Sequence, residues 1–276
     1  MQAGMEASII RKVWKNAARA AGNLSELHLT MGEVNRALEY ARQSVEFADR
    51  SEDAFQKYAR KSNLANALHQ SGDIAGAKRL LREAEEIQKE NQPEKPFLYS
   101  FPGFLFCDLL LGTVRYREVL ERAKSTIEIA RINKWLLDIA FDTLSLGRAS
   151  LLKALEEQAG DFSMAADYLN KAVEGLRDAG TMDHLPKGLL ARAELYRVQK
   201  EYQKAHDDLD EAREIAERGG MRLYLADYHL EAARLCLAEG DRDSARWHRD
   251  TVKEMIEEMG YHRRDREVDE LERLLG

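Results

Sequence analysis

The side chains best spaced for metal chemistry lie in one short stretch, His206, Asp207 and Asp210. A histidine and a carboxylate four residues apart lie on one face of a helix, which is a spacing able to hold a metal ion. Two ligands on an exposed helix do not make a closed coordination site, which needs three or four. We therefore predict a solvated surface at this stretch and no metal site.

The two cysteines, Cys107 and Cys236, are the candidate thiol nucleophiles. They lie 129 residues apart, each within an apolar pattern of helical spacing where nothing would lower the pKa of the thiol. Two isolated cysteines of this kind predict reduced core residues of a cytoplasmic protein and not a disulfide framework.

The sequence contains none of the short motifs that mark common hydrolytic, metal-dependent or nucleotide-binding sites. Absent are His-Glu-x-x-His, Cys-x-x-Cys, Gly-x-Ser-x-Gly, Gly-x-Gly-x-x-Gly and the phosphate loop Gly-x-x-x-x-Gly-Lys-Ser/Thr. We therefore predict a protein that is not an enzyme, with no catalytic residue, no metal and no cofactor.

The most basic short run is Arg263, Arg264 and Arg266, which alternates with acidic residues. The alternation predicts surface ion pairs within the run, with binding of an acidic partner as the alternative. Over the whole chain 49 acidic residues outnumber 42 basic ones, a formal net charge of −7. A general nucleic-acid-binding protein needs a basic face to neutralise phosphates, so this balance predicts no nucleic-acid partner.

The composition favours a helical protein with a substantial core. Of 276 residues, 44% are hydrophobic, 33% are charged and only four are proline. So few helix breakers, with abundant Ala, Leu, Glu and Arg, are typical of an all-α chain. No apolar run approaches the ~18 residues of a membrane span, and no signal segment opens the sequence. We therefore expect a cytoplasmic protein with no membrane partner.

Six segments align on one small residue, at successive spacings of 40, 42, 46, 40 and 40 residues. The aligned residues are Ala37, Ala77, Val119, Ala165, Ala205 and Ala245. Five positions earlier, four segments have a glycine and two have Val114 or Lys200 instead. An acidic residue follows each glycine, and a second small position recurs seven residues after the aligned one. A period of this length predicts a helical repeat protein.

Each repeated position has a physical role in a pair of helices. A glycine tolerates the positive φ at which a helix ends and the chain turns back. The acidic residue begins the next helix, where its charge complements the helix dipole. Small residues seven positions apart lie on one face and let two helix axes approach closely.

We therefore predict an all-α, right-handed α-solenoid of about six TPR-like (tetratricopeptide-like) helix pairs, forming a single domain over 1–276. The predicted pairs lie near 6–50, 52–92, 98–133, 135–179, 185–219 and 221–260. The first pair is expected to open with one continuous helix over 6–31. A last helix over 262–275 is typical of the cap that covers the end of a repeat array. Asn91–Pro96 is the one predicted hinge.

The small-residue positions, together with Leu146 and Gly147, resemble the tetratricopeptide signature, whose helix–turn–helix unit has about 34 residues. Four longer stretches, at 99–110, 135–148, 180–192 and 258–265, resemble the C-terminal repeat region of bacterial STAND-type signalling ATPases with NACHT or NB-ARC modules. This resemblance covers nearly all of residues 14–265. It implies that the repeats act as a sensor or partner-binding arm and that the nucleotide-binding module lies in a separate domain.

The first helices of such pairs line a concave groove in which solenoids bind extended or helical segments. Counting back from each turn predicts the polar side chains that face this groove. They are Asn23, Glu26, Asn63, Asn66, Asp108, Arg148, Glu194 and Arg234. Their mixed charge predicts a polar protein or peptide partner recognised by shape, and Asn63 and Asn66 are expected to hydrogen-bond its backbone.

Five aromatic residues occur within ten positions, and Trp135 is expected nearby; the five are Phe97, Tyr99, Phe101, Phe104 and Phe106. They fill the junction between the second and third pairs, or some of them anchor a partner, because aromatic anchors dominate binding hot spots. We add Phe101 and Phe104 to the eight polar residues above and call the ten the inner-face set.

These observations predict a non-catalytic scaffold or sensor module that binds a protein or peptide segment in the groove, as part of a signalling or defence protein. Two alternatives stay open. The apolar stripe Ile9–Trp14 packs on the first pair or pairs with a second copy, which would make the chain a self-assembly module and a homo-oligomer. A small molecule held inside the superhelix would instead make it a ligand-sensing domain.

Overall fold

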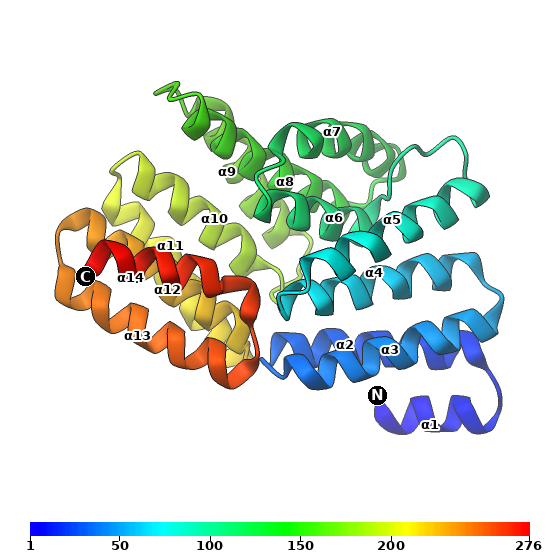
Figure 1. The fold of residues 1–276 in the computed structure, drawn as a ribbon. Helices are drawn as coiled ribbons and strands as arrows, with labels where there is room; N and C mark the ends of the chain where they lie inside the picture. The colour runs from blue at the N-terminus through cyan, green and yellow to red at the C-terminus, as the bar shows by residue number, and fades with distance from the viewer. The chain divides into compact units, whose positions relative to one another are not determined.

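The computed structural model describes residues 1–276, which form fourteen α-helices and no strand. After α1 (Gln2–Ile10), the first helices of six pairs are α2 (Trp14–Thr30), α4 (Ala54–Gln70), α6 (Ser100–Gly112), α8 (Leu136–Glu156), α10 (Leu185–Val198) and α12 (Arg222–Glu239). Their partners are α3 (Val34–Ser51), α5 (Ile74–Asn91), α7 (Tyr116–Asn133), α9 (Ser163–Asp178), α11 (Tyr202–Gly219) and α13 (Arg242–Met259). Helix α14 (Asp265–Leu275) ends the chain (Figure 1). The predicted all-α fold of six helix pairs and a final helix is confirmed.

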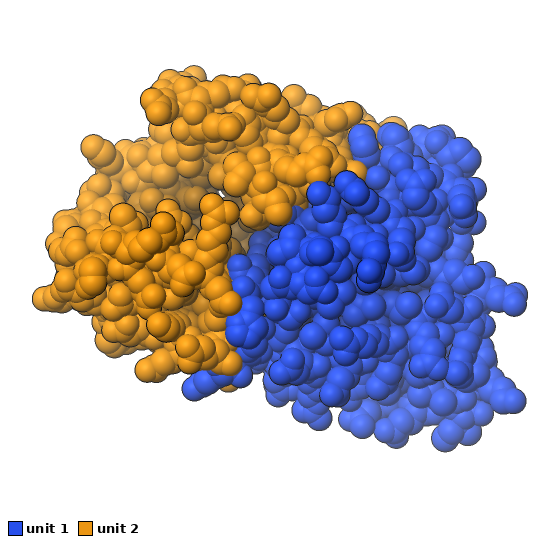
Figure 2. All heavy atoms as spheres, in the orientation of Figure 1, with its two compact units in different colours: residues 1–109, 258–263 blue, residues 110–257, 264–276 orange.

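The contacts of the chain divide it into two compact units, which Figure 2 colours separately. Unit 1 consists of residues 1–109 and 258–263, and unit 2 of residues 110–257 and 264–276. The first division falls inside α6 and not at the predicted hinge, Asn91–Pro96. Across that hinge segment, the side chain of Gln88 donates to the carbonyl of Phe97 at 2.8 Å. The single domain stays a prediction.

Within each unit the first helices of consecutive pairs pack on each other. Helix α2 packs on α4 in unit 1, and α10 packs on both α8 and α12 in unit 2. The second helices α3 and α5, α7 and α9, and α9 and α11 make no comparable contacts. A stack with closer contacts on one side curves toward that side, so the first helices lie on the inner side of each unit.

The aligned small residues lie where neighbouring helices approach most closely. All six, from Ala37 to Ala245, are at most 1% exposed, and the second column, from Ser44 to Val252, is also buried. Gly147 of the predicted signature shows why size matters, since a Cβ added there would lie 2.7 Å from the side chain of Leu169 on α9. Larger side chains at such positions cost about 1–3 kcal/mol through overpacking.

The turns between paired helices follow the predicted glycine pattern. The four turn glycines, Gly32, Gly72, Gly160 and Gly240, have φ between 65° and 90°. Val114 and Lys200 replace glycine but adopt the same left-handed backbone, at φ 57° and 61°. The turn geometry is therefore kept where glycine is absent, and the backbone strain rises.

Two of the three aspartates that follow a turn glycine cap the next helix, whereas Asp161 lies one residue before the N-cap Phe162 of α9. Asp73 Oδ1 accepts the backbone N–H of Gly76 at 2.8 Å, and Asp241 Oδ1 accepts that of Ser244 at 3.1 Å. Glu33 and Glu201 precede α3 and α11 without such a bond, because their side chains are one methylene longer.

The expected continuous helix over 6–31 is wrong. Helix α1 ends at Ile10, Lys12 adopts φ 56°, and α2 begins at Trp14. The turn brings Ile9 and Trp14 against a buried cluster that includes Ala17, Leu24 and Phe47. The turn could not be predicted from the sequence, because it contains neither the glycine nor the acidic residue that occurs at most of the predicted turns.

The final helix covers the end of unit 2 as predicted for a cap. Val268, Leu271 and Leu275 are at most 5% exposed. On α13, the guanidinium groups of Arg242 and Arg246 donate to the carbonyl of Leu275 at 3.0 and 3.2 Å. These bonds satisfy acceptors that the last turn of a helix otherwise leaves unpaired.

Unit 2 has three buried carboxyl groups, on Asp142, Asp208 and Glu231, of which Asp142 makes no ion pair. Asp142 of α8 is 3% exposed; its Oδ1 lies 2.9 Å from Thr126 Oγ1 of α7, and its Oδ2 has no hydrogen-bond partner. Burial raises the pKa of Asp142 to about 7, although the Thr126 hydroxyl opposes this shift. Thr126 Oγ1 also lies 3.1 Å from the carbonyl of Arg122 and has one proton to donate. A protonated Asp142 can therefore donate to Thr126 while Thr126 donates to that carbonyl.

We predict that Val114→Gly raises the free energy of unfolding by about 1 kcal/mol, measured by urea denaturation. Val114 is 52% exposed, so the change relieves left-handed strain with little loss of packing. As the converse control, Gly240→Ala should destabilise the chain by a similar amount, since nothing lies within 4 Å of the added Cβ and only backbone strain changes. Unchanged stability of Val114→Gly would contradict the strain argument.

We predict that Asp142→Asn stabilises the chain at pH 8 by on the order of 2–4 kcal/mol and has a much smaller effect near pH 4. The folded-state pKa of Asp142 is raised above its usual 3.8, so its proton favours the folded state. Stability from this group is complete below about pH 4 and is lost as the pH rises through about 7. Melting temperatures of both proteins across this range test the prediction. The control is Asp207→Asn, at an exposed carboxylate, which should show no such pH dependence. The prediction would be refuted if the melting temperatures of Asp142→Asn and wild type changed in parallel with pH.

Candidate partner-binding face

The inner-face residues of unit 1 form a polar row across α2 and α4. Asn63 Nδ2 of α4 donates to Glu26 Oε1 of α2 at 2.8 Å, which joins the first helices of consecutive pairs. Asn63 is only 4% exposed, so this bond uses it within the fold. Asn23 on α2 is exposed and Asn66 on α4 is half-buried. Of the three asparagines, Asn23 and Asn66 are therefore the ones that solvent reaches.

A chain of side-chain bonds orients Asn66. Gln70 Nε2 donates to Asn66 Oδ1 at 2.7 Å, and Gln70 Oε1 in turn lies 3.3 Å from Arg263 Nη1. Arginine is only a donor, so it fixes which end of the Gln70 amide is the acceptor. Asn66 Oδ1 is then the acceptor for Gln70, and its Nδ2 group, which makes no hydrogen bond in the structure, is left as a donor.

A buried arginine lies beside the row. Arg60 of α4 is 9% exposed, and a Cβ added at Gly22 of α2 would lie 2.0 Å from its Nη1. Burial lowers the pKa of the Arg60 guanidinium, and the nearby charge of Glu26 opposes that shift. Gly22 therefore leaves the space that the end of the Arg60 side chain occupies, and a larger residue there would have to displace that guanidinium, which the sequence pattern did not reveal.

Asp108 of α6 is bound by the segment 258–263, which belongs to unit 1. Arg263 Nη1 donates to Asp108 Oδ2 at 2.6 Å, and Arg263 Nη2 donates to Oδ1 at 3.1 Å. The two side chains are 8% and 14% exposed. A bidentate arginine–carboxylate pair of this kind is among the strongest side-chain contacts. A partner would reach Asp108 only by displacing Arg263.

The basic run therefore differs from the prediction of ion pairs within it. Arg263 pairs with Asp108, and Arg264 Nε pairs with Asp227 Oδ1 at 2.8 Å. The contact of Arg264 with Glu267, at 2.6 Å, is the one that fits the local pattern. The main partners lie 155 and 37 residues away in the chain, so spacing within the run could not identify them.

In unit 2 the inner-face residue Arg234 lies beside a buried glutamate, Glu231. Arg148, Glu194 and Arg234 are half-buried. Arg234 Nη1 lies 3.5 Å from Oε2 of Glu231, and Arg197 Nε donates to Oε1 of the same residue at 2.5 Å. Glu231 is 5% exposed, so the two arginines compensate a charge that burial alone would make costly.

The aromatic residues of unit 1 divide into buried and partly exposed members. Phe104 and Phe106 are each 2% exposed, whereas Phe97, Tyr99 and Phe101 are half-buried. The rings of Phe101 and Phe104 stack with their centroids 6.3 Å apart. Phe104 therefore serves as core packing, and Phe101 is the aromatic member of the inner-face set that solvent reaches. Trp135 in unit 2 is 39% exposed at the start of α8.

The N-terminal stripe divides in the same way. Trp14 stacks on Phe47 with ring centroids 6.0 Å apart, and Ile9 packs on the same cluster. Ile10 and Val13 turn away from it and are 81% and 41% exposed. Part of the Ile9–Trp14 stripe therefore packs on the first helix pair. Formation of a homo-oligomer through the rest of the stripe stays a prediction.

The other candidate residues make ordinary helix contacts. His206 Nε2 lies 3.0 Å from Glu239 Oε2 of α12, and no three His, Cys, Asp or Glu side chains come together as metal ligands. Cys107 is 2% exposed, and burial raises the pKa of the Cys236 thiol. None of the helices combines the length and the apolar character needed to cross a membrane.

Solved structures show what this arrangement resembles. A Rap protein complexed with Competence and Sporulation Factor superposes with a TM-score of 0.67 at 15% identity, over 91% of this chain and 71% of that one. BtubC (BKLC) from P. vanneervenii aligns at 19% identity over 84% and 92%, with a TM-score of only 0.49. No protein-family model and no curated protein sequence matches the chain. The likeness to the Rap protein shows the fold, a TPR-like helical repeat.

Proposed function

We propose that the chain is a non-catalytic protein-binding scaffold that holds a protein or peptide segment against its inner-face set. The main support is the Asn63–Glu26 bond, which joins the inner-face positions of two consecutive first helices. A row of polar groups at repeat spacing can bind the backbone of an extended or helical segment. The shared fold with a Rap protein that was crystallised with Competence and Sporulation Factor adds to this support.

The exposed members of the row would make the contacts. Asn66 presents an Nδ2 donor whose direction is set by Gln70 and Arg263, and Asn23 lies exposed on the neighbouring helix. A donor held in one orientation binds a carbonyl group at a lower entropic cost than a freely rotating amide. Phe101 supplies an aromatic surface in the same unit. Asn63, Phe104 and Asp108 would act by shaping the row and not by direct contact.

A finer proposal follows from the resemblance to STAND-type ATPases. We propose that the scaffold serves as the sensor region of a bacterial signalling or defence protein and acts in the cytoplasm. The test is the composition of the complete gene product, in which a nucleotide-binding domain would support this role. A gene product that lacked one would favour a free-standing adaptor.

We predict that the triple variant Asn23→Ala, Glu26→Gln, Asn66→Ala recovers at least tenfold less of a specific partner than wild type in a quantitative pull-down. Glutamine at position 26 keeps an acceptor for Asn63 but removes the charge beside buried Arg60, so circular dichroism first checks that the variant folds. The matched control is Asn35→Ala with Asn133→Ala, at exposed asparagines of the second helices α3 and α7. Equal recovery of every specific partner by the triple variant would defeat the assignment to the inner-face set.

A second proposal, self-assembly, is favoured by the exposure of Ile10 and Val13. On this proposal, light scattering at high concentration gives a multiple of the 31.5 kDa chain mass, and Ile10→Glu with Val13→Glu restores the single-chain mass, because buried charges oppose association. Ile132→Glu is the control, since Ile132 on α7 is also 81% exposed. A wild-type monomer at the highest soluble concentration would rule this proposal out.

A further inference from the structure

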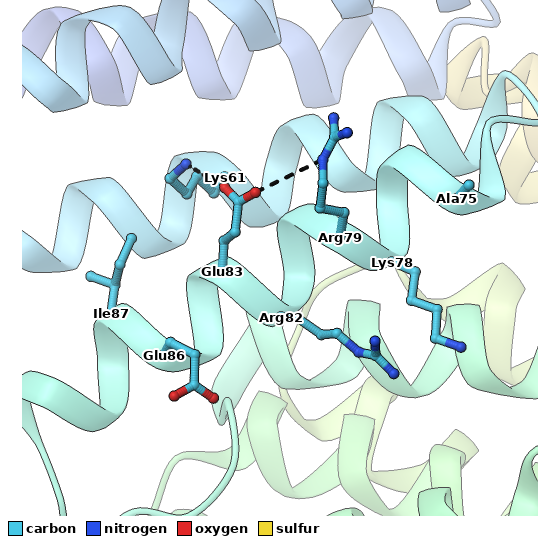
Figure 3. Close-up of a pocket in the computed structure, with 8 residues that line it drawn as sticks. All are labelled: Lys61, Ala75, Lys78, Arg79, Arg82, Glu83, Glu86 and Ile87. Carbon is cyan, nitrogen blue, oxygen red and sulfur yellow. Dashed lines mark hydrogen bonds and ion pairs between the residues drawn. The ribbon is translucent and has the colours of Figure 1, made fainter.

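A hollow of about 710 Å³ lies over α5 in unit 1, away from the inner-face set. Its lining comes from α5, together with Lys61 of α4, and Figure 3 shows these side chains. Lys61 lies two residues before Asn63, on the opposite side of α4, because successive helical positions differ by about 100°. The hollow is therefore a different surface from the one proposed above to hold a partner.

The charges in the hollow do not balance. Four cations line it, Lys61, Lys78, Arg79 and Arg82, against the two carboxylates Glu83 and Glu86. Both carboxylates are already paired, Glu83 with Lys61 at 2.9 Å and with Arg79 at 3.8 Å, and Glu86 with Lys89 at 3.1 Å. Lys78 and Arg82 make no ion pair. Two uncompensated positive charges thus lie together on a chain whose net charge is −7.

The two unpaired cations have a defined spacing. Lys78 and Arg82 are four residues apart on α5, so they lie one helical turn from each other on the same face. Figure 3 shows Arg79 and Glu83 on the side of α5 nearer Lys61, whereas Lys78 and Arg82 point away from Lys61. Carboxylates one helical turn apart on an opposing segment would match this spacing.

The remaining lining is apolar. Ala75 is exposed and Ile87 is half-buried on α5, and the aliphatic stems of the lysines and arginines extend the apolar surface between them. A purely ionic ligand gains nothing from this surface. An amphipathic segment gains from both parts, because its apolar side chains lose contact with water while its carboxylates meet the cations.

We propose that the α5 hollow is a second docking surface, which takes an acidic amphipathic helix of a protein partner. Glutamates or aspartates four residues apart on that helix pair with Lys78 and Arg82. Separate apolar side chains of that helix lie against Ala75 and against Ile87, which are about 18 Å apart along α5. Nucleic acid fits less well, because the paired Glu83 and Glu86 remain close to any phosphate and the apolar lining has no counterpart on a phosphate backbone.

The test uses the full chain and two labelled synthetic peptides. One is a helical peptide with glutamates four residues apart and leucines beside them, and the other has lysine in place of each glutamate. Fluorescence anisotropy should show binding of the glutamate peptide that weakens with salt. The variant Lys78→Glu with Arg82→Glu should bind it at least tenfold more weakly and should gain affinity for the lysine peptide. Both positions face solvent at least in part, and circular dichroism checks that the variant folds.

The charge-matched control is Lys124→Glu with Arg266→Glu, at two exposed cations of unit 2 that make no ion pair. This control should bind the glutamate peptide as wild type does. The inner-face triple variant should also bind it normally, so failure of this proposal and failure of the scaffold proposal give different results. The proposal would be overturned if wild type did not bind the glutamate peptide, or if Lys78→Glu with Arg82→Glu bound it as tightly as wild type does. So would a single-stranded oligonucleotide that binds more tightly than the peptide and depends on the same two residues.

Discussion

The close approach of helix axes at the small-residue columns is the constraint on which the rest of this structure depends. A residue such as Ala77 or Ala205 has only a methyl side chain, which is too small to hold the helices apart, so each second helix can lie close against its neighbours. That contact fixes the spacing of the pairs, and the spacing brings the first helices of successive pairs together. The Asn63–Glu26 bond can form only because α2 and α4 are held at this distance. The geometry of the polar row therefore follows from alanines that never touch it.

The inner side of the stack is polar, and polarity there has a cost that determines how its residues are used. A charged group that loses water must be paired, which is why Arg263 lies on Asp108 and why two arginines surround Glu231. Several residues that could contact a partner are thus already bonded to other side chains within the fold. The groups left for recognition are those with an exposed donor, as at Asn23 and Asn66, and the direction of the Asn66 amide is set by Gln70 and Arg263. Stability and recognition are in this way properties of the same network.

The sequence predicted what local spacing determines. The turn glycines and the small-residue columns recur with the period of the helix pairs, and the apolar face of α14 follows helical spacing. The structure has each of them at the expected position. Val114 and Lys200 show the strength of this rule, because they adopt the glycine backbone without being glycine. Spacing could not predict pairing between distant residues. The turn at Lys12 is set by packing of Ile9 and Trp14, and the partner of Arg263 is 155 residues away. The candidate residues therefore lie on the first helices of the pairs, as spacing predicted, whereas which of them stay accessible depends on contacts between distant residues.

The same reasoning separates two kinds of charged surface on one helix pair. On α4 the inner side presents amides whose hydrogen bonds are nearly complete, so a partner there gains mainly from shape and from a few oriented donors. On α5 the outward face has two cations without counter-ions beside apolar side chains, so a partner there gains from charge and from burial. Binding at the first surface should depend weakly on salt, and binding at the second should depend on it strongly, because exposed ion pairs are screened within about 10 Å at ordinary ionic strength. A partner that engaged both would combine selectivity from one face with fast, charge-guided association at the other.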